Sequence, residues 1–129
     1  MSQVAAGRRD QVELVFPAEG RFRGIGRLVV SGLASRFELP VDRVNDLVLA
    51  VETLLLGDIS GAEVTLQAVV EDESLCLRLG PFARDTTADE GVVRLLTPLV
   101  DTVANVPHAA GGNWIELTVG SHHLDESDG

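Results

Sequence analysis

Residues 41–57 read VDRVNDLVLAVETLLLG, and this stretch decides the fold. Its apolar residues recur at i, i+3, i+4 and i+7, the spacing of a continuous apolar face on an α-helix; they are Val44, Leu47, Val48, Val51, Leu54 and Leu55. Pro40 stops whatever precedes it, Asp42 can cap the new helix, and Gly57 ends it. In a chain this short, we expect the other elements to pack on this helix.

The segment before this helix predicts a strand and another helix. Alternating apolar residues favour a strand over residues 11–16, and Pro17 follows it. Residues 22–37 carry apolar side chains at helical spacing, with Arg23 and Arg27 on the opposite face. Residues 11–16 are apolar and little charged, and as the first strand they would lie at a sheet edge. An uncovered edge of this kind favours a homodimer.

The second half of the chain predicts a hairpin, a third helix and a last strand. Alternation over residues 62–70 and 75–79, around an acidic turn at 71–73, is typical of a β-hairpin with one buried face. Thr87 and Glu90 form a capping box before a helix that the apolar spacing extends to Val103. Residues 105–112 read as a loop, and residues 115–119 alternate again.

The resulting order is β-α-α-β-β-α-β, which predicts an α+β fold. We expect a two-layer sandwich, with a mixed, mostly antiparallel sheet and the helices on one face. The domain spans residues 11–120 as a single unit, and residues 1–10 and 121–129 are expected to be disordered tails.

Composition narrows the classes of partner. The formal net charge of the 129-residue chain is −10, and all its basic residues are arginines. Such a charge repels phosphate backbones, so nucleic acid is not an expected partner. No apolar run is long enough to span a bilayer, so no membrane association is expected. The first ten residues lack the apolar run of a signal peptide, and a single cysteine excludes an internal disulfide, so we expect a cytoplasmic protein.

Several stretches resemble the bacterial anti-sigma factor serine/threonine kinases of the GHKL (histidine kinase-like) ATPase superfamily. Residues 39–51 are similar to the lead-in to the first ATP motif of that family, and residues 77–82 to the strand and turn of its second motif. Residues 93–101 resemble the helix after the lid, and residues 112–117 the closing strand. The resemblance covers residues 12–119 and implies a GHKL-like sandwich.

The first ATP motif is incomplete by this resemblance. The family carries a glutamate that orients the attacking water and, four residues later, an asparagine that holds Mg²⁺. These positions are Thr53 and Gly57 here; a shift of one residue provides Glu52 but leaves Leu56 for the asparagine. Neither glycine nor leucine has a side-chain oxygen, so the resemblance implies that the metal ligand is absent.

The other two motifs are also altered. The family uses an aspartate to accept a hydrogen bond from the adenine amino group, and the aligned residue is Arg78, which has only donors. Gly80 survives from the glycines that follow. Where the family's glycines line the triphosphate, Gly91 remains and Glu90 adds negative charge. The remnant cleft would consist of Arg78, Gly80 and Gly91, with no catalytic residue and no cofactor.

The resemblance therefore implies a non-catalytic regulatory protein-binding module, with a sigma factor or an anti-sigma antagonist as its partner. One alternative is an active ATP-dependent serine/threonine kinase with a rearranged site, which would use ATP and Mg²⁺. Another is a structural subunit that pairs with an intact paralogue. Arg23 and Arg27 could clamp an acidic partner or form a solvated helix face. The adjacent His122 and His123 predict no metal site, because neighbouring side chains on a regular element point apart.

Overall fold

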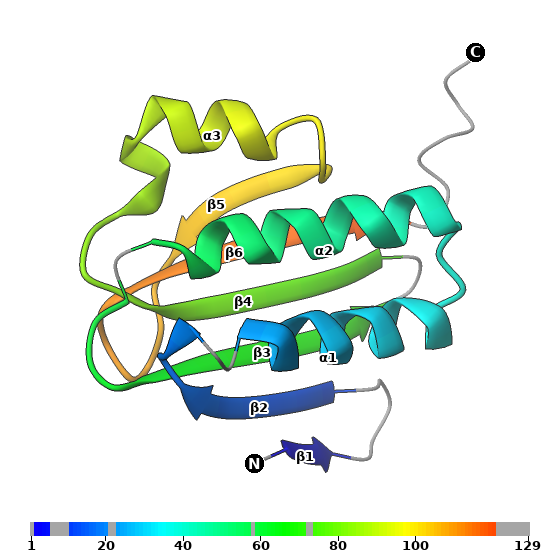
Figure 1. Cartoon of the computed structure of the whole chain (residues 1–129), viewed down its shortest axis with the longest axis horizontal. Coiled ribbons are helices and arrows are strands. Elements are labelled where there is room, and N and C mark those ends of the chain that lie inside the picture. Colours follow the sequence, from blue (N-terminus) through cyan, green and yellow to red (C-terminus); the bar gives the residue numbers. More distant parts are fainter. Residues whose placement is uncertain (1, 6–10, 21–22, 58, 72–73, 121–129) are drawn as a thin grey trace.

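One antiparallel sheet forms the frame of the protein, and the helices cover one of its faces (Figure 1). The computed structural model describes residues 2–5, 11–20, 23–57, 59–71 and 74–120. Among these residues the sheet has six strands in the order β1-β2-β3-β4-β6-β5. The strands are β1 (Ser2–Ala5), β2 (Gln11–Pro17), β3 (Glu63–Glu71), β4 (Ser74–Phe82), β5 (Thr102–Val106) and β6 (Asn113–Gly120).

The α+β class with an antiparallel sheet is as expected, although the sheet is not mixed. Each described pair of neighbouring strands is antiparallel. The helices are α1 (Arg23–Arg36), α2 (Val41–Leu55) and α3 (Glu90–Leu96), and a 3₁₀ turn, η2 (Thr86–Ala88), precedes α3. In Figure 1, α1 and α2 lie side by side across the sheet. No helix among the described residues is both long enough and apolar enough to cross a bilayer.

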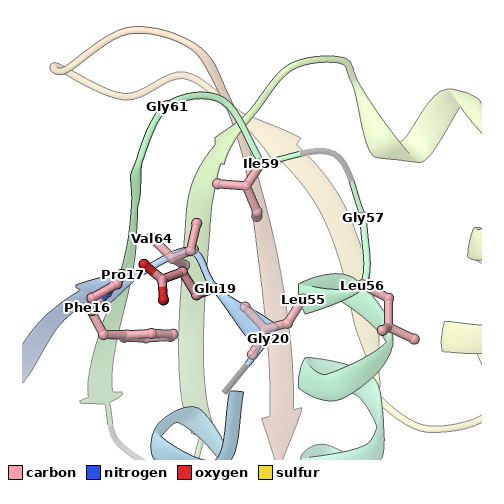
Figure 2. Close-up of a pocket in the computed structure, with 11 residues that line it drawn as sticks. Phe16, Pro17, Glu19, Gly20, Leu55, Leu56, Gly57, Ile59, Gly61 and Val64 are labelled. Carbon is pink, nitrogen blue, oxygen red and sulfur yellow. The ribbon is translucent and has the colours of Figure 1, made fainter. Parts of the chain in front are cut away.

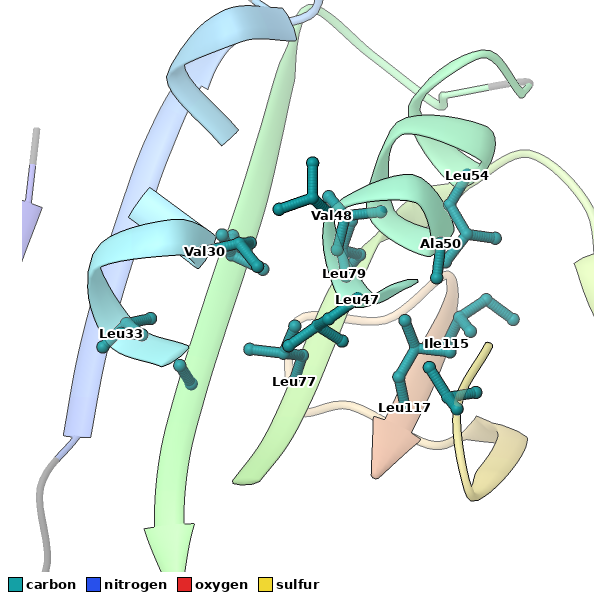
Figure 3. Close-up of a cluster of buried hydrophobic side chains, with 14 of the residues drawn as sticks. Val30, Leu33, Leu47, Val48, Ala50, Leu54, Leu77, Leu79, Ile115 and Leu117 are labelled. Atoms are coloured by element: carbon teal, nitrogen blue, oxygen red, sulfur yellow. The ribbon is translucent and has the colours of Figure 1, made fainter. Parts of the chain in front are cut away.

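The core lies between α2 and the middle of the sheet. On α2, Leu47, Val51 and Leu54 are at most 1% exposed. They meet the inward side chains of the central strands, which include Leu77, Leu79, Ile115 and Leu117 (Figure 3). Burying one such side chain contributes about 1.5–3 kcal/mol to folding. The apolar stripe of residues 41–57 is therefore the main attachment of the helical layer.

Both expected boundaries of α2 differ from the structure. The N-cap residue is Pro40, which makes no side-chain cap bond, so the expected cap by Asp42 is wrong. Asp42 lies inside the first turn, where its charge still favours the positive end of the helix dipole. The helix ends at Leu55 with Leu56 as a right-handed C-cap, so Gly57 follows the helix without adopting a left-handed conformation.

The third helix is shorter than the periodicity predicts. It ends at Leu96, and Val103 belongs to β5, which the sequence interpretation missed. Pro98 explains the early end, because proline removes a helix hydrogen bond and restricts the residue before it. The expected capping box is also wrong. Asp89 caps α3 by accepting from the backbone N–H of Gly91 at 2.9 Å and of Val92 at 3.3 Å.

The N-terminal residues change the expected sheet edge. We expected residues 1–10 to be a disordered tail, but Ser2–Ala5 form β1 and pair with β2. Residues 11–16 therefore do not form a sheet edge, because β1 and β3 flank β2 on its two sides. The expected tail at 121–129 and residues 6–10 lie outside the described residues.

A buried arginine connects the helical layer to the last two strands. The Arg43 side chain on α2 is only 9% exposed and binds Asp101 with a 2.9 Å contact between Nη2 and Oδ1. The second carboxylate oxygen of Asp101 accepts from the backbone N–H of Gly120 at 2.7 Å. Asp101 therefore joins the start of α2 to the start of β5 and the end of β6.

The core predicts a sharp contrast between two substitutions on α2. Val51→Asp places an unpaired carboxylate at a fully buried position, and we expect it to lower the free energy of unfolding by at least about 3 kcal/mol. Leu49→Asp is the matched control, because Leu49 is 51% exposed on the same helix. Urea unfolding measures both variants, and equal stabilities would contradict the assigned face of α2.

Candidate functional site

The α2 residues of the expected ATP motif occupy the solvent side of the helix. The Glu52 carboxylate accepts from Arg27 Nε at 2.9 Å, which joins α2 to α1. The Thr53 hydroxyl donates to the carbonyl of Leu49 in the preceding turn at 2.8 Å. Neither side chain is directed into a cleft by these bonds. Arg27 thus has a partner within the chain, and the side chain of Arg23 lies outside the description.

Arg78 and Gly80, the two positions of the expected second motif on β4, lie on the helix-free face of the sheet. Leu75, Leu77 and Leu79 are buried under the helices, whereas Arg78 is exposed on the opposite face. Arg78 Nε donates to Glu116 Oε2 on β6 at 2.9 Å, and this bond raises the pKa of the guanidinium. The neighbouring residue on the side of α2 is Leu79, whose side chain has no hydrogen-bonding group.

The expected site residues are not brought together. Gly91 lies in the first turn of α3, where its N–H is used by the Asp89 cap. Glu52 and Thr53 lie on the outer side of α2, whereas Arg78 and Gly80 lie on β4 and face away from the helices. The space between α2 and β4 is filled by leucine and valine side chains, as Figure 3 shows. The remnant cleft of Arg78, Gly80 and Gly91 is therefore not a single cavity among the described residues.

A pocket of about 270 Å³ lies at the C-terminal end of α2 (Figure 2). Its lining comes from the segment after β2, the end of α2 and the start of β3, and includes Phe16, Glu19, Leu55, Gly57, Ile59 and Val64. Leu56 and Gly57, the two candidate positions for the metal-binding asparagine of the family, thus both border this pocket. Most of the lining residues have apolar side chains, but the surface that they expose to the pocket is mainly polar, and Glu19 contributes a carboxylate.

The outer face of the helical layer exposes large apolar side chains. Leu28 on α1 is 71% exposed, and Leu49 and Leu56 of α2 and its C-cap are 51% and 67% exposed. Leu28 is adjacent to Arg27, while Leu49 and Leu56 flank Glu52 in the sequence. The Arg27–Glu52 ion pair joins α1 to α2, and we call the exposed residues Leu28, Leu49 and Leu56 with this pair the outer helical face. Groups of exposed apolar residues are typical of binding surfaces.

The sheet face opposite the helices carries a polar network that sequence reasoning missed. The rings of His108 and Trp114 stack with centroids 3.7 Å apart and planes 7° apart. His108 Nε2 contacts Gln67 Oε1 at 3.2 Å, and Gln67 Nε2 donates to Glu13 Oε2 at 2.8 Å. The loop after β5 therefore folds back over this face.

Two glycines make room for this fold-back. A Cβ on Gly80 would lie 2.5 Å from Trp114 Cδ2, and one on Gly112 would lie 2.9 Å from Pro81 Cβ. Gly112 also has a φ of 84°, a conformation that side chains rarely adopt. Gly80 is thus required for packing against Trp114, which is only 2% exposed. The adjacency of Gly80-Pro81 and of Gly111-Gly112 was the available sequence signal.

Neither a search for metal ligands nor comparison with known proteins assigns a further functional site. Within the described part of the chain, no group of three or more His, Cys, Asp or Glu side chains is placed to hold a metal ion. His122 and His123 lie outside that part. No family model matches the chain, and no curated protein matches its sequence.

The tight contact at Gly80 predicts a specific cost for adding one methyl group. Gly80→Ala forces Trp114 to move, so we expect a loss of about 1–3 kcal/mol of stability and a red-shifted tryptophan emission. Gly32→Ala on α1 is the control, because its Cβ meets nothing within 4 Å. The control should keep the emission and gain up to about 1 kcal/mol. Unchanged emission and stability in Gly80→Ala would contradict this packing.

Proposed function

We propose that this protein is a non-catalytic protein-binding module related to the anti-sigma factor kinases of the GHKL superfamily. Its partner would be a sigma factor or an anti-sigma antagonist, and its nucleotide site would be degenerate. The observation that carries the proposal is the separation of the expected site residues, together with an exposed apolar surface on the helices. A module of this kind keeps a scaffold and a contact surface while lacking phosphoryl-transfer chemistry.

The arrangement of β4 supports a degenerate nucleotide site. An adenine bound between α2 and the sheet would need a hydrogen-bond acceptor on the helix-facing side of β4. That side presents Leu77 and Leu79, both fully buried, while Arg78 points to the other face. An adenine amino group left unpaired there would weaken the binding of the nucleotide by about 1–3 kcal/mol. The loss applies to both Arg78 and Leu79 as the aligned residue, because neither offers an acceptor.

The outer helical face supports protein binding. Leu28, Leu49 and Leu56 supply apolar area, and the Arg27–Glu52 pair supplies charges of both signs at its centre. Exposed ion pairs contribute little to folding, about 0–1 kcal/mol, so this pair is available to exchange partners at low cost. Arg27 is thus one of the two arginines that the sequence suggested for a partner surface.

The homodimer stays a prediction, but residues 11–16 are no longer its expected interface. Residues 11–16 cannot supply an open edge, because β1 pairs with them. The end strands of the described sheet are β1 and β5, and β5 carries no charged residue. Uncharged edge strands are templates for pairing with another chain.

The degenerate site predicts that the protein does not bind ATP with Mg²⁺. Titration calorimetry of the purified chain should give no saturable heat at nucleotide concentrations up to about 1 mM, which corresponds to a binding free energy weaker than about −4 kcal/mol. Saturable binding in the micromolar range would overturn the proposal. Its loss in Arg78→Ala would then favour a kinase with a rearranged site.

The binding role predicts that the outer helical face is needed for capture of the partner. Leu49→Ser/Leu56→Ser should keep the fold, because both side chains are exposed, and should weaken binding of a captured sigma factor or antagonist at least about tenfold. Leu95→Ser is the matched control, since Leu95 is 60% exposed on α3. Equal capture by the two variants, measured by pull-down and then calorimetry, would place the partner elsewhere.

A further inference from the structure

The hydrogen bonds around His108 fix where its proton lies. The backbone N–H of Ala110 donates to His108 Nδ1 at 3.0 Å, so Nδ1 must carry a lone pair. Nε2 therefore holds the hydrogen and donates to Gln67 Oε1 at 3.2 Å. The same direction follows from the other end, because the Glu13 carboxylate only accepts and so orients the Gln67 amide with its oxygen toward His108.

The loop depends on this neutral ring. Gly111 N–H donates to the carbonyl of His108 at 2.9 Å, and Trp114 Nε1 donates to the carbonyl of Gly111 at 2.8 Å. The backbone of residues 108–111 thus forms a hydrogen bond with each of the two stacked rings. A proton added at Nδ1 would point a donor at the N–H of Ala110, and the two donors cannot share that contact.

Charged groups on the neighbouring strands would not restore the lost contact. Glu13 on β2 contacts Gln67, which lies between it and the Nε2 side of the ring. On β4 and β6, Arg78 and Glu116 pair with each other, and Cys76 Sγ contacts the same Glu116 oxygen at 3.2 Å. Residues 107–112 of the loop contain no titratable side chain besides that of His108. Protonation therefore keeps the Gln67 contact and breaks the one at Ala110.

The geometry points to a proton-operated latch in which protonation of His108 opens the turn at residues 108–111 and uncovers Trp114 on the helix-free face of the sheet. In the closed state Trp114 is 2% exposed, beneath the imidazole and beside Gly80. In the open state its indole would lie on a flat sheet surface. Tryptophan is among the residues that most often dominate binding interfaces. The latch would therefore make the exposure of Trp114 depend on pH.

The test uses the fluorescence of Trp114, the one tryptophan in a chain without tyrosine. The purified full chain is titrated from about pH 8 to pH 5, where histidine is the side chain that changes charge. We expect a one-proton transition in which the emission maximum shifts to longer wavelength as the indole meets water. Over the same range, the protection factor of the Ala110 amide in hydrogen exchange should fall roughly tenfold or more.

Variants assign the transition to His108. His108→Gln cannot be protonated and should lose the transition, whereas His122→Gln/His123→Gln removes the other two histidines and should retain it. Far-UV circular dichroism confirms that each variant is folded. Emission that loses intensity without a shift, with constant protection at Ala110, would show that the charged ring stays stacked and would overturn the latch. A shift that survives in His108→Gln would overturn it as well.

Discussion

The burial of one face of α2 against the central antiparallel strands determines most of this structure. Leu47, Val51 and Leu54 on α2 can be buried only if the facing sheet presents apolar side chains opposite them. Strands β4 and β6 do so at every second residue. The same alternation sends the intervening side chains to the other face. A single periodicity thus decides which residues form the core and which meet solvent on the helix-free side.

This constraint explains how much of the fold the sequence could predict. Residues 23–36, 41–55, 63–71 and 74–82 carry long, clear periodic patterns, and the structure has helices and strands there as expected. The missed elements are short, and their patterns are ambiguous. Val100 and Val103 continue the spacing of α3 although they follow Pro98, and β1 has only four residues. The predicted caps were wrong for a local reason. Asp42 near the start of α2 and Asp89 at the start of α3 both have side chains that can cap a helix, but only the path of the backbone decides that Asp89 does so and Asp42 does not.

The site was harder to predict than the fold, because alignment ignores which face a strand residue occupies. Arg78 matches the family's aspartate by spacing, yet its side chain leaves the helix side, and Leu79 takes the inward position. The His108–Trp114 stack depends on a contact between residues 67 and 108, which are distant in sequence. The resemblance assigned Gly80 to the family's second ATP motif. Its structural role is to admit an indole ring.

Asp101 has a consequence for the alignment of the last two strands. One of its oxygens is held by Arg43, so the position of the other, which accepts from Gly120, is fixed relative to α2. Sliding β6 by one residue would remove that N–H from the carboxylate and would also turn Ile115 and Leu117 out of the core. An electrostatic contact and an apolar one therefore select the same register. The ion pair therefore specifies the register of the last two strands, in addition to any stability that it contributes.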